Sequence, residues 1–235
     1  MNKLVVCNQK MFLTYDEASM LKKQMDEVDF FSVNLIVCPS ILNLDIFKNY
    51  TIGSQDCFYE DKGAYTGEVS AYDLSFKNVK YVIIGHSDRR KYDSDKEINL
   101  KVKAALRNGI TPILCIGETK IDKELIRTSE VLKKQLYKAL EGILLDSNEK
   151  IIIAYEPVWA IGGEKTVSKE VIEDTFKYIE KLLKEKNIYN YKLIYGGSIT
   201  SKNIKNILSD KIDGYLLGLS SVNIDELKKI IKCIK

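Results

Sequence analysis

Several residue types and patterns are scarce or missing in this chain of 235 residues. It has one histidine, one tryptophan and three prolines. The prolines, at positions 39, 112 and 157, fall at the ends of apolar runs or in loops, so none interrupts an expected helix. No apolar run comes near the ~20 residues that a membrane-spanning helix needs. We therefore expect no association with a membrane.

The five cysteines, at positions 7, 38, 57, 115 and 233, are odd in number and include no Cys-x-x-Cys pair. All but the last lie in or beside apolar runs, so we expect buried free thiols rather than disulfides or zinc ligands. The start, Met1–Cys7, reads as a short strand and lacks the charged-then-apolar layout of a secretory signal. The cytoplasm is the expected location.

A large excess of charge of one sign is also missing, because 36 basic and 33 acidic residues are spread along the whole chain. The lysine-rich stretches Lys181–Lys186 and Lys228–Lys235 alternate with apolar residues, which is typical of exposed helix faces. No basic patch of the kind that binds nucleic acid is visible. Hydrophobic residues make up 45% of the chain, enough for a sizeable core, so disorder is not expected.

Short, continuously apolar runs alternate with longer segments of helical spacing. Continuous rather than alternating hydrophobicity indicates strands that are covered on both faces, as in a parallel sheet. The expected strands are Leu4–Cys7, Leu35–Cys38, Thr51–Ser54, Tyr81–Ile84, Pro112–Cys115, Ile151–Ala154, Leu193–Tyr195 and Tyr215–Leu217. The clearest amphipathic helices are Asn99–Arg107, Leu125–Leu140, Lys169–Lys184 and Asp225–Ile231.

Local signals mark several helix ends. Ser168, Asn223, and either Thr200 or Ser201 each offer a side-chain oxygen to the free N–H groups of a following helix. Gly109, directly after Asn108, is expected to end a helix. No linker or repeat beyond the strand–helix period is visible, so we expect one domain over residues 1–235.

Eight strands that alternate with helices form either a closed (β/α)8 barrel or an open doubly wound sheet. No Gly-x-Gly-x-x-Gly follows the first strand, as it usually does in an open dinucleotide-binding fold. Polar and glycine residues instead follow the strands whose ends converge at one face of a barrel: Asn8, Lys10, His86, Glu156, Gly196–Ser198 and Gly218. This pattern favours an α/β fold of the (β/α)8 barrel type.

Three of these residues are candidates for proton chemistry. Burial beside Pro157 and Trp159 would desolvate Glu156 and raise its pKa toward the range of a general base, although a carboxylate here could equally close a strand end. His86, the only histidine, is either structural or a neutral hydrogen-bond donor, if the residues after it open a helix. Lys10 could stabilise negative charge or lie on the surface.

The loops after the seventh and eighth expected strands carry a phosphate-binding signal. They contain Gly196-Gly197-Ser198 and Gly218-Leu219-Ser220-Ser221. In (β/α)8 barrels these two loops commonly hold phosphate, with backbone N–H groups that glycines leave accessible and with a serine hydroxyl as a further donor. The alternative is two ordinary tight turns.

Seven motifs, in order and over almost the whole chain, resemble triosephosphate isomerase signatures. They are NQK at 8–10, GAYTGEVS at 63–70, YVIIGHSDRR at 81–90, PILCIGET at 112–119, AYEPVWAIG at 154–162, YGGS at 195–198 and GYLLG at 214–218. Members of this family use a glutamate base, a neutral histidine and a closing loop.

The resemblance implies an isomerase that interconverts dihydroxyacetone phosphate and D-glyceraldehyde 3-phosphate through an enediolate, without a metal or cofactor. Glu156 would be the base, His86 the electrophile, and Lys10 the source of positive potential, with Asn8 positioning it. Substrate phosphate would be bound by Gly162, Ser198, Gly218 and Leu219, under a lid of residues 157–166. A homodimer would form through the loop Phe58–Ser70, with Thr66 near its tip.

The chain departs from the family pattern at four places. Gln9 replaces a tryptophan, Asp88 a glutamate, Gly163-Glu164 a Thr-Gly pair, and Leu219 the second of two glycines. These departures leave open a catalytically silent barrel that binds a phosphorylated metabolite. A different sugar-phosphate enzyme is a second alternative, since fold alone does not fix function. One histidine argues against a metal-dependent epimerase, which needs several such ligands.

Overall fold

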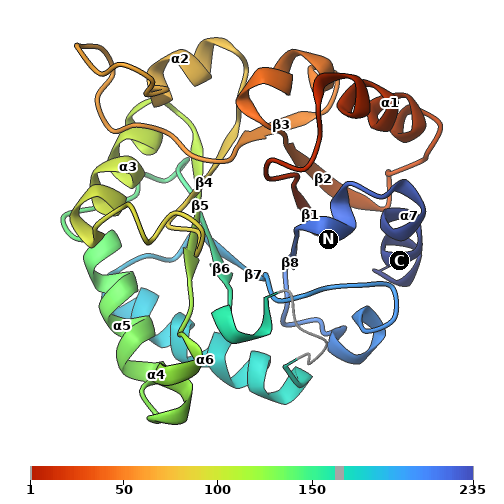
Figure 1. Cartoon of the computed structure of the whole chain (residues 1–235). Coiled ribbons are helices and arrows are strands. Elements are labelled where there is room, and N and C mark those ends of the chain that lie inside the picture. The colour runs from red at the N-terminus through yellow and green to blue at the C-terminus, as the bar shows by residue number, and fades with distance from the viewer. Residues whose placement is uncertain (1, 162–166, 235) are drawn as a thin grey trace.

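In this computed structural model, which describes residues 2–161 and 167–234, parallel strands close into a barrel in the order β1 to β8 (Figure 1). The strands are β1 Lys3–Asn8, β2 Val33–Cys38, β3 Thr51–Ser54, β4 Tyr81–Ile84, β5 Thr111–Ile116, β6 Ile151–Tyr155, β7 Tyr191–Tyr195 and β8 Gly214–Leu217. Strand β8 pairs with β1, from Leu4↔Gly214 to Cys7↔Leu217, which closes the ring. The expected (β/α)8 barrel is thus confirmed.

Helices surround the strands on the outside of the barrel (Figure 1). The α-helices are α1 Tyr15–Asp26, α2 Ala71–Phe76, α3 Asp95–Arg107, α4 Lys120–Glu124, α5 Thr128–Ala139, α6 Lys169–Glu185 and α7 Ile224–Ile234. Short 3-10 turns are η1 Ile41–Phe47, η2 Val158–Ala160, η3 Ile204–Ile207 and η4 Leu219–Ser221. Within the described ranges, no helix has both the length and the apolar character needed to cross a membrane.

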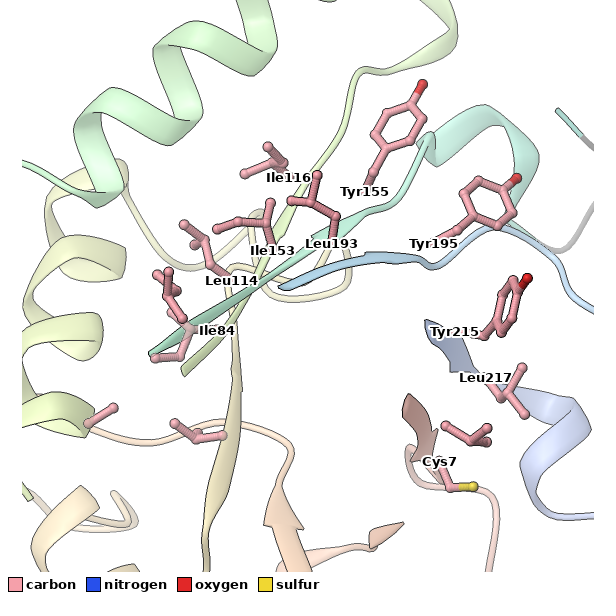
Figure 2. Packing of buried hydrophobic residues seen from close by; sticks show 14 of the residues in the cluster. Cys7, Ile84, Leu114, Ile116, Ile153, Tyr155, Leu193, Tyr195, Tyr215 and Leu217 are labelled. Carbon is pink, nitrogen blue, oxygen red and sulfur yellow. The ribbon is translucent and has the colours of Figure 1, made fainter. Parts of the chain in front are cut away.

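Each strand buries both of its faces, which explains why the apolar runs are continuous. Leu4 and Val6 of β1 belong to the small core inside the barrel, whereas Val5 and Cys7 belong to the larger core between strands and helices. Figure 2 shows part of this outer layer, to which β1 and the strands β4 to β8 contribute side chains such as Cys7, Ile84 and Tyr155. The five cysteines are free and four are buried, as expected.

Helix boundaries differ from the sequence expectation at three places. Helix α3 begins at Asp95 rather than Asn99, because Ser94 and Glu97 form a reciprocal capping box. The helix expected over Leu125–Leu140 is α5, which begins later, at Thr128, because Ile126, whose φ is +57°, separates it from the unexpected helix α4. A second capping box, between Thr119 and Asp122, starts α4.

The helix expected to begin at Thr200 or Ser201 was also wrong. The Thr200 N–H bonds to Asn203 Oδ1 at 2.8 Å, and Ser201 Oγ bonds to Glu226 of α7 at 2.9 Å, so neither side chain caps a helix. Only the short turn η3 follows. By contrast, Ser168 caps α6, and Asn223 Oδ1 accepts the Glu226 N–H at the start of α7. Gly109 ends α3 with a φ of +67°.

The seam between β1 and β8 requires glycine at position 214. A Cβ atom there would lie 2.2 Å from the Leu4 carbonyl oxygen, inside the ladder that closes the barrel. We expect Gly214→Ala to lower the free energy of unfolding by about 1–3 kcal/mol, as overpacking usually does. Urea unfolding followed by circular dichroism measures this, with Gly218→Ala as control because a Cβ there meets only Lys10 Cε, at 3.8 Å. Equal midpoints for the two variants would contradict the prediction.

Candidate active site

A cavity of about 330 Å³ opens at the C-terminal end of the barrel. The loops after β1, β4, β6, β7 and β8 all contribute to its wall, so residues far apart in the sequence meet there. The predicted site residues that line it are Asn8, Lys10, His86, Glu156, Ser198, Gly218 and Leu219. Gly162, the remaining predicted site residue, lies outside the described residues. Gln9 does not line the cavity; it is 1% exposed and buried behind it.

Glu156 follows directly after β6 and is 3% exposed. Its N–H bonds to the Ile116 carbonyl at 2.8 Å, which continues the pairing with β5. Two glycines leave the room that this residue needs: a Cβ at Gly117 would lie 1.8 Å from the Glu156 carbonyl oxygen, and one at Gly196 would lie 2.8 Å from Glu156 Cγ. Burial raises the pKa of the Glu156 carboxyl, although His86, Cys115 and Lys10 favour its charged form.

His86 faces this carboxylate, with its Nε2 at 3.3 Å from Glu156 Oε1. Its other ring nitrogen, Nδ1, accepts the backbone N–H of Asp88 at 3.0 Å. In the neutral ring this hydrogen bond assigns the proton to Nε2, which points at Glu156 and the cavity. The helix expected directly after His86 is absent from this described segment: residues 87–92 form hydrogen-bonded turns, and α3 begins at Asp95. The sequence led us to expect the positive end of a helix to face His86, and the Asp88 N–H takes that place.

Lys10 occupies a left-handed backbone conformation, with a φ of +48°. Asn8 Oδ1 accepts its N–H at 3.2 Å, and Gln55 Nε2 donates to its carbonyl at 2.8 Å. A non-glycine residue held at positive φ costs about 1–3 kcal/mol, so the neighbouring contacts must fix this geometry. Asn8 thus contacts the Lys10 backbone directly.

The Lys10 ammonium group pairs with Asp88, Nζ to Oδ2, at 3.0 Å. The shorter aspartate side chain therefore still reaches the lysine. Burial by itself would raise the pKa of the Asp88 carboxyl, but the hydrogen bond from Lys10 and the nearby positive groups outweigh it and hold this pKa below its ordinary value.

The two glycine–serine loops lie side by side at the cavity. Ser220 Oγ donates to the Ile199 carbonyl at 2.5 Å, which ties the loop after β8 to the loop after β7. Asn203 Nδ2 donates to the Ser198 carbonyl at 2.8 Å and orders the first loop. Leu219 begins η4 and is not among the residues with positive φ, so leucine fits this position without backbone strain; its side chain is 67% exposed.

An ion cluster around the buried Lys101 was not predicted. Lys101 of α3, only 3% exposed, bonds Asp56 at 2.8 Å and Asp93 at 2.8 Å. Arg89 bonds the same two carboxylates, at 3.0 and 3.2 Å. These pairs hold the segment that carries His86 and Asp88 against the barrel. The sequence carries no signal for them, because Lys101 reads as part of an exposed helix face.

This arrangement can move protons. A desolvated carboxylate can take a proton from carbon, and an N–H donor and an ammonium group beside it can stabilise the negative charge that results. In the part of the chain described, no group of three or more His, Cys, Asp and Glu side chains could hold a metal ion.

Because burial raises the Glu156 pKa, the ionised carboxylate costs stability. A carboxyl with a raised folded-state pKa binds its proton more tightly when folded, so the native state loses stability as the pH rises from 4.5, the ordinary value, through the raised pKa. We therefore expect Glu156→Gln to raise the free energy of unfolding by about 1 kcal/mol at pH 8. The gain should vanish below pH 4.5. Chemical denaturation at both pH values tests this against the exposed Glu170→Gln; a Glu156→Gln protein less stable at pH 8 would contradict it.

Known proteins resemble this chain over its full length. A model of the triosephosphate isomerase family matches residues 3–234. The triosephosphate isomerase of Alkaliphilus oremlandii is 38% identical over 242 residues, covering 97% of this chain and 98% of that protein. That of Geotalea uraniireducens is 37% identical over 248 residues, covering 99% of both, and that of Clostridium perfringens is 36% identical over 242 residues, covering 97% and 98%. With this coverage and the barrel that carries the matched motifs, the chain belongs to the triosephosphate isomerase family.

Proposed function

We propose that this chain interconverts dihydroxyacetone phosphate and D-glyceraldehyde 3-phosphate by proton transfer through an enediolate. The observation that carries the proposal is the pairing of the buried Glu156 carboxylate with the Nε2 of His86, at 3.3 Å, in the cavity at the end of the barrel. Family membership supplies the substrate, and this pair supplies the groups that the reaction needs.

Glu156 is the general base. It removes a proton from the carbon next to the carbonyl of dihydroxyacetone phosphate and returns it to the neighbouring carbon. Its burial favours this role, because a raised pKa brings a carboxylate closer to the basicity that proton abstraction requires. Gly117 and Gly196 favour it too, since they allow the residue to sit at the cavity wall with little water around it.

His86 is the electrophile. With Nδ1 occupied by the Asp88 N–H, its neutral ring presents an Nε2 proton to the cavity, where a substrate carbonyl oxygen can accept it. The same group can then move protons between the two oxygens of the enediolate. Lys10 supplies positive potential for this negatively charged intermediate, and Asn8 and Asp88 fix its backbone and its ammonium group.

The phosphate group binds between the loops after β7 and β8. Ser198 contributes to the first loop, and Gly218 and Leu219 contribute backbone N–H groups from the second, at the start of η4. The bond from Ser220 to the Ile199 carbonyl supports this proposal, because it holds the two loops together. Gly162 would add a donor from a lid of residues 157–166, of which residues 162–166 lie outside the described residues.

Turnover of glyceraldehyde 3-phosphate, coupled to NADH oxidation without added metal, tests the proposal. We expect Glu156→Gln to lower kcat by about 10²–10⁴-fold, the usual contribution of a positioned base. Glu170→Gln, which removes an exposed carboxylate of α6, should leave kcat unchanged. Absence of turnover in the folded wild-type protein would instead favour a silent barrel that binds a phosphorylated metabolite.

The enzyme is further proposed to be a homodimer that forms through the loop Phe58–Ser70. Phe58 bridges to Ser70 at the base of this loop and packs against Tyr59 and Tyr65, so the loop has an ordered root. The loop extends outward before α2 (Figure 1), and Thr66 is exposed. A neighbouring cavity of about 400 Å³, lined by Lys10, Met11 and Gly67 among others, could receive the same loop of a second copy.

Met11, at 93% exposed, stands at this cavity and should be covered in the dimer. We expect Met11→Arg to raise the dimer dissociation constant at least about tenfold, because a charge would be buried at the centre of the contact. Sedimentation velocity over a dilution series measures this. Leu144→Arg, at a site that is 85% exposed on the loop before β6, is the control. If both variants associate like the wild type, the proposed interface is wrong.

The proposal treats residues 1–235 as one domain, because the first and last strands pair within one barrel. Free cysteines agree with a cytoplasmic location, where thiols stay reduced.

A further inference from the structure

A second cavity, of about 450 Å³, opens at the N-terminal end of the barrel, at the opposite end from the active site. Its wall is built from residues at or near the starts of β1, β2, β3, β4, β6 and β7. Among the described residues, none lines both this cavity and the active-site cavity, which is built from the loops after the strands. A cavity of this size can hold a small organic molecule.

The floor of this cavity is apolar. Leu4, Ile36 and Ile152 line it and are 6%, 2% and 1% exposed. All three belong to the small core inside the barrel, against which the partly buried Tyr81 is packed. The same core continues along the strands through buried side chains such as Ile83, so it separates this cavity from the active site.

Two lysines stand above this floor because of the alternation of side chains along β6 and β7. Residues two apart in a strand face the same side of a sheet. Lys150 comes two residues before Ile152, and Lys192 comes two residues before Ile194; both isoleucines belong to the core inside the barrel. Both lysines therefore face the inside of the barrel and line the cavity, where branched apolar residues usually dominate.

Only one of these two lysines is neutralised by a carboxylate. Lys192 Nζ pairs with Asp213 Oδ1 at 3.0 Å, and Asp213 Oδ2 accepts the Leu193 N–H at 2.8 Å. Lys150 has no carboxylate partner among the described residues; its Nζ donates to Tyr81 Oη at 3.4 Å and lies 5.5 Å from the centroid of that ring. None of the described residues that line the cavity is acidic. The cavity therefore carries one uncompensated positive charge over an apolar floor.

These features select a ligand with a single negative charge and a flat apolar body. Lysine has three N–H donors, and Lys150 uses one of them on the Tyr81 hydroxyl, so the others are free for a carboxylate. The Tyr81 hydroxyl, while it accepts from Lys150, can donate its own proton to the same carboxylate. An aromatic ring on the ligand can lie beside the Tyr81 ring and over the apolar floor. A phosphate dianion fits less well, because only one charge is left to balance it.

We propose that the N-terminal end of the barrel is a second binding site, for a small aromatic monocarboxylate. Lys150 and Tyr81 hold the carboxylate, and Leu4, Ile36 and Ile152 contact the ring. The site is independent of the proposed isomerase reaction, because the two cavities are lined by different residues at opposite ends of the barrel. Its ligand can therefore bind whether or not the active site is occupied.

Calorimetric titration of the full chain with cinnamate tests the proposal, and cinnamamide is the uncharged comparison. Lys150→Met keeps an apolar stem and removes the charge. Lys80→Met is the matched control, since Lys80 is exposed and directly precedes Tyr81 but does not line the cavity. Lys10→Met removes the lysine of the active-site cavity and so detects binding there. Far-ultraviolet circular dichroism establishes that each variant is folded.

We expect the wild type to bind cinnamate and Lys150→Met to raise its Kd about tenfold, the effect of losing one hydrogen bond to a charged group. Cinnamamide should bind the wild type and Lys150→Met with equal Kd, because it lacks the charge. Lys80→Met and Lys10→Met should bind cinnamate like the wild type. Absence of cinnamate binding, or equal affinity of the wild type and Lys150→Met, would overturn the proposal. A loss confined to Lys10→Met would also overturn it, by placing cinnamate in the active-site cavity.

Discussion

The structure depends on keeping one carboxylate, that of Glu156, out of water at the mouth of the barrel. Burial is what makes this group useful, because desolvation raises its pKa, and it is also what makes the site expensive to fold. The surrounding residues moderate that cost without cancelling it. His86 Nε2 lies 3.3 Å from Glu156 Oε1, while Glu156 Oε2 is buried and has no hydrogen-bond partner among the described residues.

The same constraint explains where glycine is required. Gly117 and Gly196 lie at the ends of β5 and β7, on either side of Glu156, and a side chain at either place would strike it. Because neighbouring strands of a barrel are close at their ends, a buried residue between two of them can be accommodated only if its neighbours are small. The glycines of the two motifs therefore make room for Glu156 as well as for any phosphate.

Much of this could be predicted from the sequence. The apolar runs locate all eight strands, because burial on both faces leaves a continuous signal, and the polar residues after them identify the face on which His86 and Glu156 meet. The start of α3 and the unpredicted helix α4 did carry a signal, since Ser94 with Glu97 and Thr119 with Asp122 have the spacing of a capping box.

Other features were beyond local reasoning because they depend on what covers a residue in three dimensions. Lys101 lies on a helix whose pattern gives no reason to bury it, and only the packing of α3 against the chain near Asp56 and Asp93 does so. The donor to His86 Nδ1 is a backbone N–H in a turn, which no residue type encodes. Trp159 and Glu118 are 41 residues apart in sequence, and their contact follows only from the adjacency of β5 and β6.

The departures from the family pattern show that the site constrains atoms more strongly than residue types. Asp88 is one methylene shorter than the usual glutamate, yet its carboxylate meets the Lys10 ammonium at 3.0 Å, because the lysine side chain is long enough to close the gap. Leu219 replaces a glycine, yet its backbone is ordinary for the start of a 3-10 turn, so an N–H remains there. Gln9 is buried with neither amide atom hydrogen bonded to a described residue, so the cost of that change falls on the core. Departures of the first two kinds keep a charged pair and a backbone N–H at the cavity, and the third places unpaired amide atoms in the core.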